Sequence, residues 1–380
     1  MIRPDRLAEH LIALLRIPSP SRREGAVAAR LAQDLRGLGA AVTFDGAGEK
    51  VGGEVGNCIA RLPGTVPGAP PLLLNAHMDN VPGGTGRVVR EDGLLRSDGR
   101  GILGADDKAG CAAIVEALRA AVEGGLPRGD VEVVFTICEE VGLLGATHLE
   151  PAGLRAKEAL VLDGDLPGKV TTAAPSADRL EVRIYGREAH AGVRPEQGIN
   201  AIRVAAEAIA ALRLGRLDEE TTANVGTIEG GSAVNVVPGL VRLRAEARSH
   251  DEDKLRAQVA HMRGCLEAAA ARHAVTVDGT RYQARVEVEV TRQYTRMAVP
   301  AEARLVGLLR QAARRVGVEV RTHRTGGGLD ANAFNANGIQ AVGIGCGQRA
   351  IHTPEEHCVL ADVAAAAGLV LEVLRLNAGG

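Results

Sequence analysis

The 380-residue chain has little of several features that mark common classes of protein. It contains no tryptophan and only 2% aromatic residues, so the stacking platforms that single-stranded nucleic acid requires are largely missing. Its 45 basic and 47 acidic residues leave a formal net charge of −2, which provides no electrostatic attraction for a polyanion or a membrane surface. We therefore expect neither nucleic acid nor a membrane as a partner.

Clustered cysteines and long apolar runs are also missing. The six cysteines form neither a CxxC pair nor a dense framework, so we interpret them as reduced and mostly buried thiols. The longest apolar run near the amino terminus is LIALL, too short for a secretory signal, and no stretch is long enough to span a bilayer. These observations predict a cytoplasmic protein. The length favours two domains.

The apolar patterns divide the chain into two kinds of region. The first opens with two amphipathic helices and continues with short apolar runs, typical of buried strands, that alternate with the helix AGCAAIVEALRAAV. The second contains strands with one polar face, in the order strand, helix, strand, strand, helix, strand, which is the ferredoxin-like pattern. We predict an α/β fold with an open mixed sheet flanked by helices over residues 1–176 and 292–380. A ferredoxin-like α+β domain is inserted at residues 177–291.

Acidic and histidine side chains follow several of the predicted strands. They are His77 and Asp79 after PLLLNA, Glu139 and Glu140 after VEVVFTIC, and Asp163 after ALVL, with Asp106 and Asp107 directly before the helix. In an open α/β sheet, ligands bind beyond the carboxyl ends of the strands. A turn or capping role explains any one of these residues. Their occurrence in four separate segments favours a shared site.

One histidine with several carboxylates is a ligand set typical of a divalent cation of the zinc type. There are more carboxylates than one ion needs, which indicates two ions bridged by a carboxylate, and Asp106 is placed for that role. The DGD segment offers both Asp163 and Asp165 as ligands. We prefer Asp163, because it follows the strand directly.

Five segments together resemble a known family. NAHMDNV, LGADDKAG, CEEVGLLGA, VLDGD and AIHTPEE are similar to the metal-binding motifs of the co-catalytic zinc exopeptidases. That family includes peptidase T, carboxypeptidase G, acetylornithine deacetylase and succinyl-diaminopimelate desuccinylase. The motifs occur in the family's order over nearly the whole chain, and GGGLDANAF with AIHTPEE favours the peptidase T-like branch.

The resemblance implies two zinc ions per subunit, with Co²⁺ or Mn²⁺ as alternatives. His77, Asp106 and Asp163 would hold one ion, and Asp106, Glu140 and His352 the other. It also implies a cis peptide bond between Asp106 and the residue after it.

Two acidic residues receive other roles. Asp79 would accept the imidazole N–H of His77 and orient the ring. Glu139 is the expected general base, which takes a proton from a metal-bridged water and hands it to the leaving amine.

The inserted domain corresponds to the family's lid, which often forms a homodimer. His190 resembles the histidine that stabilises the tetrahedral oxyanion, and Arg248 resembles an arginine that grips a substrate carboxylate. Asn224 and Asn235 fall in the corresponding lid segment, and we count Asn224 among the substrate-binding residues. The glycine-rich residues 325–334 resemble the loop that faces the substrate.

The sequence therefore predicts a two-zinc metallopeptidase, an aminopeptidase for di- or tripeptides. An N-acyl amino acid deacylase of the same fold is the alternative, because it would use the same metals and base. A nucleotide-dependent oxidoreductase is more remote. It rests on GRGILG at residues 99–104, a G-x-G-x-x-G match that follows a short charged segment instead of the buried strand that such a fingerprint requires.

Overall fold

The computed structural model describes residues 1–83 and 87–379, and the chain divides into two compact units. Unit 1 contains Met1–Ala174 and Met297–Gly380, and unit 2 contains Pro175–Arg296. The second unit is slightly longer at both ends than the expected 177–291, because its first strand begins at Ser176 and its last runs to Tyr294.

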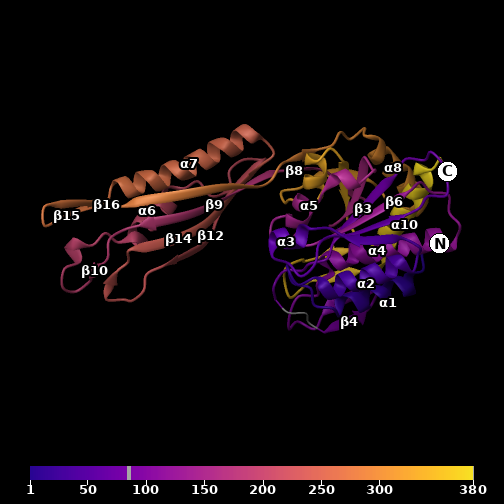
Figure 1. The fold of residues 1–380 in the computed structure, drawn as a ribbon, viewed down its shortest axis with the longest axis horizontal. Helices are drawn as coiled ribbons and strands as arrows, with labels where there is room; N and C mark the ends of the chain where they lie inside the picture. Colours follow the sequence, from indigo (N-terminus) through magenta and orange to yellow (C-terminus); the bar gives the residue numbers. More distant parts are fainter. Residues whose placement is uncertain (84–86, 380) are drawn as a thin grey trace. The chain divides into compact units, whose positions relative to one another are not determined.

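Unit 1 is built around a mixed sheet with the strand order β1-β2-β6-β3-β7-β20-β8-β18, and β19 pairs with β8 (Figure 1). Strands β6, β3, β7 and β20 run parallel. The strands are β1 (Ala41–Phe44), β2 (Cys58–Leu62), β3 (Leu72–His77), β6 (Val131–Thr136), β7 (Glu158–Leu162), β8 (Lys169–Ala174), β18 (Met297–Ala298), β19 (Arg321–Arg324) and β20 (Gln340–Ile344).

Helices cover both faces of this sheet, which explains why its central strands are apolar without alternation. Leu72 and Leu74 point into a core with helices on one face, whereas Leu73 points into a second core on the other. The first core involves α1 (Pro4–Leu15), α2 (Gly25–Arg36), α4 (Ala105–Glu123), α8 (Arg304–Val316) and α10 (Leu360–Asn377). The second involves α9 (Ala331–Ala336) and Leu149, which directly follows α5 (Leu144–His148), and α3 (Ala47–Val51) contacts α5.

The parallel strands bring chemically active residues to one edge of the sheet. His77 is the last residue of β3, Asp163 directly follows β7, and Glu139 lies three residues beyond β6. Asp106 lies in the first turn of α4. A short 3₁₀ turn, η1 (Pro151–Gly153), precedes β7. The sheet thus delivers four separate segments to the same edge, where an open α/β fold binds its ligands.

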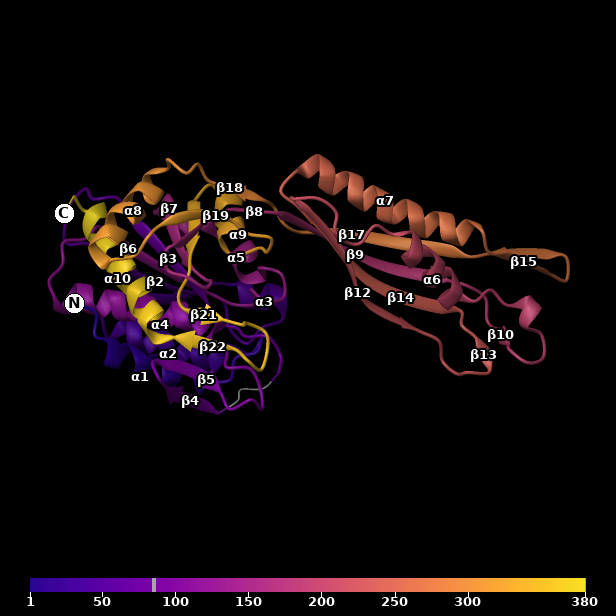
Figure 2. The same ribbon diagram turned by 180° about the vertical axis from the view of Figure 1, so that it is seen from behind.

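A small antiparallel sheet lies beside the main one in unit 1 (Figure 2). It pairs β4 (Val88–Glu91), β5 (Leu94–Ser97), β22 (His357–Val359) and β21 (Gln348–Arg349). His352 lies in the loop between β21 and β22. The GRGILG segment follows β5 and not a strand of the main sheet, so the buried strand that a dinucleotide fingerprint requires is missing there.

Unit 2 has the expected order β9 (Ser176–Tyr185), α6 (Ala201–Ala211), β12 (Thr221–Gly230), β14 (Leu240–Ser249), α7 (Glu252–Ala271) and β17 (Arg285–Tyr294). Its antiparallel sheet has the order β11-β12-β14-β9-β17, with β11 at Gly215–Arg216. Leu180, Val182 and Ile184 alternate with exposed polar residues and pack into a core with α6 and α7. The α/β class with an inserted α+β domain is therefore confirmed.

Unit 2 also contains a hairpin between α7 and the last strand, β17. Strands β15 (Ala274–Val277) and β16 (Thr280–Gln283) form a separate two-stranded antiparallel sheet. Asp278 and Gly279 between them both have positive φ, as a two-residue hairpin turn requires. Smaller elements are β10 (Ala189–His190), which pairs with β13 (Val236–Val237), and η2 (Pro195–Gln197).

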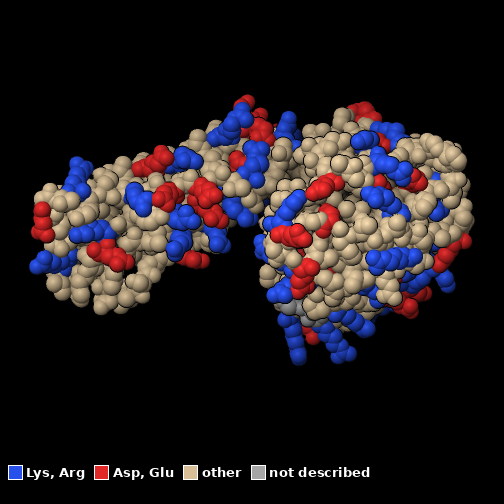
Figure 3. Space-filling view, viewed as in Figure 1, with Lys and Arg blue, Asp and Glu red and all other residues tan. Residues whose placement is uncertain are grey.

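The surface agrees with the balanced composition. Acidic and basic side chains are interspersed over both units on the face drawn in Figure 3. Among the described residues, no helix combines the length and the apolar character needed to span a membrane.

Candidate active site

One carboxylate, that of Asp106, faces two imidazole rings with its two oxygens. Asp106 Oδ1 lies 3.1 Å from His77 Nε2, and Asp106 Oδ2 lies 3.2 Å from His352 Nε2. The two histidines come from segments 275 residues apart, the end of β3 and the loop after β21. Asp106 therefore has the geometry of a group shared between two neighbouring binding positions.

Further carboxylates complete two groups around Asp106. The first group is His77, Asp106 and Asp163, and the second is Asp106, Glu140 and His352. Within each group, one candidate ligand atom from every residue lies within 4.8 Å of the others. His352 Nε2 is 3.0 Å from Glu140 Oε1. A third, overlapping group joins His77 with Glu139 and Glu140.

The crowding of these acids raises their affinity for protons. Burial and the nearby Asp106 carboxylate raise the pKa of Asp163 to about 8. Burial likewise raises the pKa of Glu139 and Glu140 above the usual range. Hydrogen bonds with Asp106 and Glu140 raise the pKa of His352 to about 10. Burial disfavours the charged form of a carboxyl group and neighbouring carboxylates add to this effect, whereas the same carboxylates stabilise the protonated form of an imidazole.

This donor set fits divalent cations. Among the described residues, Asp106 forms ion pairs with His77 and His352, and Glu140 forms one with His352, but no lysine or arginine pairs with Asp106, Glu139, Glu140 or Asp163. Buried charges require compensation by pairing or by a metal. Imidazole nitrogen and carboxylate oxygen are the ligands that zinc-type ions take.

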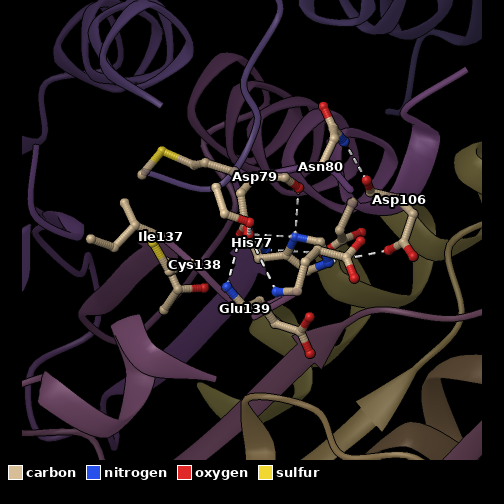
Figure 4. Close-up of polar contacts among 12 residues, drawn as sticks. His77, Asp79, Asn80, Asp106, Ile137, Cys138 and Glu139 are labelled. Carbon is tan, nitrogen blue, oxygen red and sulfur yellow. Dashed lines mark hydrogen bonds and ion pairs between the residues drawn. The ribbon is translucent and has the colours of Figure 1, made fainter. Parts of the chain in front are cut away.

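Asp79 contacts the His77 ring with both its backbone oxygen and its carboxylate, and its expected role in orienting the ring stays a prediction. His77 Nδ1 lies 2.9 Å from the main-chain oxygen of Asp79 and 3.5 Å from its carboxylate Oδ1, so the backbone carbonyl makes the closer contact (Figure 4). The carboxylate also accepts hydrogen bonds from the backbone N–H groups of Glu139 and Glu140 and from the hydroxyl of Ser21.

The sequence placed Asp107 at the same edge of the sheet but gave it no role, and other buried polar residues around the site were missed. Asp107 accepts hydrogen bonds from His77 N at 3.2 Å, Gly110 N at 3.1 Å and Gln348 Nε2 at 2.8 Å. The Asp106–Asp107 peptide bond is cis, as the resemblance implied. Asp107 was visible in the sequence as the second acid of LGADDKAG, but only its contacts identify its role.

Asp330 and Glu356 were missed, although both fall in segments that the sequence analysis had singled out. Asp330, in the glycine-rich segment, is 2% exposed and accepts hydrogen bonds from Thr136 and, at 3.4 Å, from Asn75 Nδ2. Burial raises its pKa to about 6. Glu356, four residues after His352, is 1% exposed.

The predicted substrate-binding residues belong to unit 2 and stand outside the three groups. His190 is exposed in β10 and its Nδ1 accepts Gly192 N at 3.2 Å. Asn224 is exposed on β12. Arg248, on β14, forms an ion pair of 3.0 Å with Glu246. Their roles stay predictions.

The fold and the donor set together define a metal-dependent hydrolase of the exopeptidase type. Residues 73–376 match the sequence model of peptidase family M20/M25/M40, and the chain belongs to this family. The Bacillus subtilis protein YqjE is 36% identical over 376 residues, which cover 98% of this chain and 99% of that protein.

Two solved structures are similar over their full lengths. The aminopeptidase PepT from Bacillus cereus is 36% identical, with a TM-score of 0.85, and a tripeptidase from Staphylococcus aureus is 34% identical, with a TM-score of 0.90. Both alignments cover 100% of this chain and 100% of the other. These relatives place the chain in the peptidase T-like branch.

Proposed function

We propose that the protein is an aminopeptidase that removes the first residue of di- or tripeptides. The observation that carries this proposal is the shared Asp106 carboxylate, whose oxygens face His77 and His352 at 3.1 and 3.2 Å. Similarity to an aminopeptidase and a tripeptidase, each over the whole chain, supports the substrate class.

Two zinc ions are the proposed cofactors, with Co²⁺ or Mn²⁺ as alternatives. His77, Asp106 and Asp163 would hold one ion, and Asp106, Glu140 and His352 the other, since these are the groups whose ligand atoms converge. When bound, two such ions polarise a carbonyl oxygen and increase the acidity of water. Asp106 is the ligand common to both.

Glu139 is the proposed general base. It belongs to the group with His77 and Glu140, yet among the described residues it has no side-chain ion pair, which leaves its carboxylate free for proton transfer. Glu139 takes one proton from the attacking water as the new C–O bond forms. It then passes that proton to the peptide nitrogen as the C–N bond breaks, so the amine leaves neutral. Burial raises the pKa of Glu139, which suits a group that must hold a proton between the two steps.

The proposal extends to unit 2, which would act as lid and as the surface for a homodimer. His190 would stabilise the oxyanion, and Arg248 would bind the substrate carboxylate with Asn224 nearby. If so, Arg248→Ala should raise KM for a tripeptide with a free carboxyl terminus and leave KM for its amidated form unchanged. Arg244→Ala, an exposed arginine on the same strand, is the control.

The decisive experiment combines metal analysis with peptide hydrolysis by the wild type and Glu139→Gln. We expect about two ions per chain in both proteins. Turnover by Glu139→Gln should fall by at least roughly a hundredfold, because the amide cannot accept the proton. Undiminished turnover would remove Glu139 from this role.

The same assay separates the aminopeptidase from an N-acyl amino acid deacylase. Tripeptides and acetyl or succinyl amino acids are offered side by side, and the products are identified. Release of the free amino-terminal residue from tripeptides supports the proposal. Hydrolysis of the acyl amino acids alone would replace it with the deacylase.

A further inference from the structure

Glu356, near the carboxyl terminus, binds the backbone of the turn that contains Asp106. Its Oε2 accepts the backbone N–H of Gly104 at 2.8 Å, and its Oε1 accepts that of Asp106 at 3.1 Å. The side chain is 1% exposed and lies 250 residues beyond Asp106 in the sequence. Glu356 follows His352 by four residues, and His352 faces Asp106. The Glu356 carboxylate therefore connects the segment of His352 with the segment of Asp106.

These two N–H groups have no partner of their own in the helix. Gly104 precedes α4 with φ of 75°, and as a glycine it offers no capping side chain. Asp106 and Asp107 have non-helical backbone angles, so regular helical bonding starts beyond them. The first N–H groups of a helix need outside acceptors, and buried ones left unsatisfied are costly. Glu356 supplies both acceptors with a single side chain.

The opposite side of the turn is held separately. Asn80, three residues after His77, donates its side-chain N–H to the main-chain oxygens of Gly104, at 3.2 Å, and of Asp106 (Figure 4). The carboxylate of Asp107 in turn accepts His77 N. The carbonyl groups of Gly104 and Asp106 are thus bound by Asn80, from the segment of His77, and their N–H groups by Glu356, from the segment of His352.

We propose that Glu356 is a positioning residue that sets the spacing between Asp106 and His352. It thereby preforms the metal position made of Asp106, Glu140 and His352. This inference rests on the proposed function. It adds that Glu356 affects the affinity for one ion more than the affinity for the other. Outer residues that orient ligands affect metal affinity without touching the metal. Loss of the Glu356 carboxylate should weaken the second ion more than the first.

The test measures ion binding directly. Metal-free wild type, Glu356→Gln and Glu355→Gln are titrated with Co²⁺, followed by calorimetry and by visible absorption. Gln keeps one acceptor but turns an NH₂ group toward a backbone N–H. We expect its Kd for the second Co²⁺ to rise about 10 to 100-fold, with the first changed by less than about threefold. Turnover of a tripeptide should recover when Co²⁺ is added in excess.

Glu355→Gln makes the same chemical change on the neighbouring, exposed residue and should bind both ions as the wild type does. A purely structural role for Glu356 would lower the unfolding temperature and leave the ratio of the two Kd values unchanged, which would overturn the inference. Equal weakening in Glu355→Gln would overturn it too.

If Glu356→Gln does not fold, as judged by circular dichroism, Glu356→Asp decides. It keeps the charge and shortens the side chain by one methylene, so it should weaken the second ion selectively. An unchanged second Kd in that variant would overturn the inference. A wild type that binds fewer than two ions would instead contradict the proposed function.

Discussion

The backbone N–H of Glu139 donates to Asp79 Oδ1 at 2.9 Å. The other carboxylate oxygen, Asp79 Oδ2, accepts the N–H of Glu140 at 3.2 Å. One fully buried side chain at the end of β3 therefore fixes the main chain of both glutamates that follow β6. Since the proposed base and a proposed ligand are adjacent, this carboxylate determines how they share the space around His77.

Asp79→Asn should lower kcat while both ions stay bound. Asparagine keeps one oxygen acceptor, but its NH₂ group opposes the second backbone N–H, so the glutamate segment must shift. We expect kcat to fall about 10 to 100-fold, with a smaller change in KM. Ser21→Ala is the matched control, because it removes only the hydroxyl that donates to Asp79 Oδ2 at 2.6 Å. Wild-type kcat in Asp79→Asn would show that the contact is not needed.

The DGD segment allows a comparison of two aspartates that differ in environment. Asp163 belongs to a group with His77 and Asp106, whereas Asp165 is 43% exposed and pairs with Lys169 at 3.2 Å. Asp163→Asn should lose about one ion per chain and most of its activity. Asp165→Asn should keep both ions and near wild-type turnover, since exposed ion pairs contribute little. Metal analysis of the two variants decides which of the two aspartates is the ligand.

The edge of the sheet could be predicted because apolar runs mark where buried strands end. His77 and Asp163 directly follow such runs, so their common location followed from strand polarity alone. His352 had no comparable signal. It lies in an irregular loop with φ of 64°, between two short strands, and only the resemblance singled it out.

The residues whose side chains bind the backbone around the site could not be predicted. Glu356 and Asp79 bind backbone N–H groups, and a backbone donor leaves no mark on the sequence around it. Asp330 meets Thr136 from a loop 194 residues away. By contrast, the β15–β16 hairpin had a local signal in Asp278 and Gly279, which the sequence analysis did not use.

A close approach between α4 and β7 predicts opposite effects for two Gly→Ala changes. A Cβ at Gly110 would lie 2.3 Å from the main-chain oxygen of Leu162, just before Asp163, and 2.5 Å from Asp107 Oδ1. Gly110→Ala must separate the helix from the strand, so it should destabilise the protein by about 2 kcal/mol or more. Denaturant unfolding of the metal-free protein measures this.

Gly264→Ala is the control within another helix. Gly264 is exposed in the middle of α7, and an added Cβ meets nothing within 4 Å. The change should stabilise the protein by about 1 kcal/mol, because alanine is the better helix former. A stabilising Gly110→Ala would contradict the close approach.

Asp34 should make stability depend on acid pH. Burial alone would raise the pKa of Asp34, but hydrogen bonds with His10 at 2.8 Å and Arg30 at 2.9 Å outweigh burial and hold the pKa below its usual range. Arg119 adds a third contact at 2.8 Å. A carboxyl whose pKa is lower in the folded state contributes stability above its unfolded pKa. That contribution disappears as the pH falls through the folded value.

Asp34→Asn should therefore be less stable than the wild type at pH 7, by about 2 kcal/mol, because the charge that satisfies three cationic or polar partners is lost. The difference should shrink as the pH falls below about 4, where the wild-type carboxyl itself becomes protonated. Urea unfolding at a series of pH values measures it. Asp5→Asn, whose side chain is 91% exposed beside Arg90, should follow the wild type throughout. If the difference in free energy of unfolding between Asp34→Asn and the wild type stays constant as the pH falls below about 4, the carboxylate is excluded as the source of the effect.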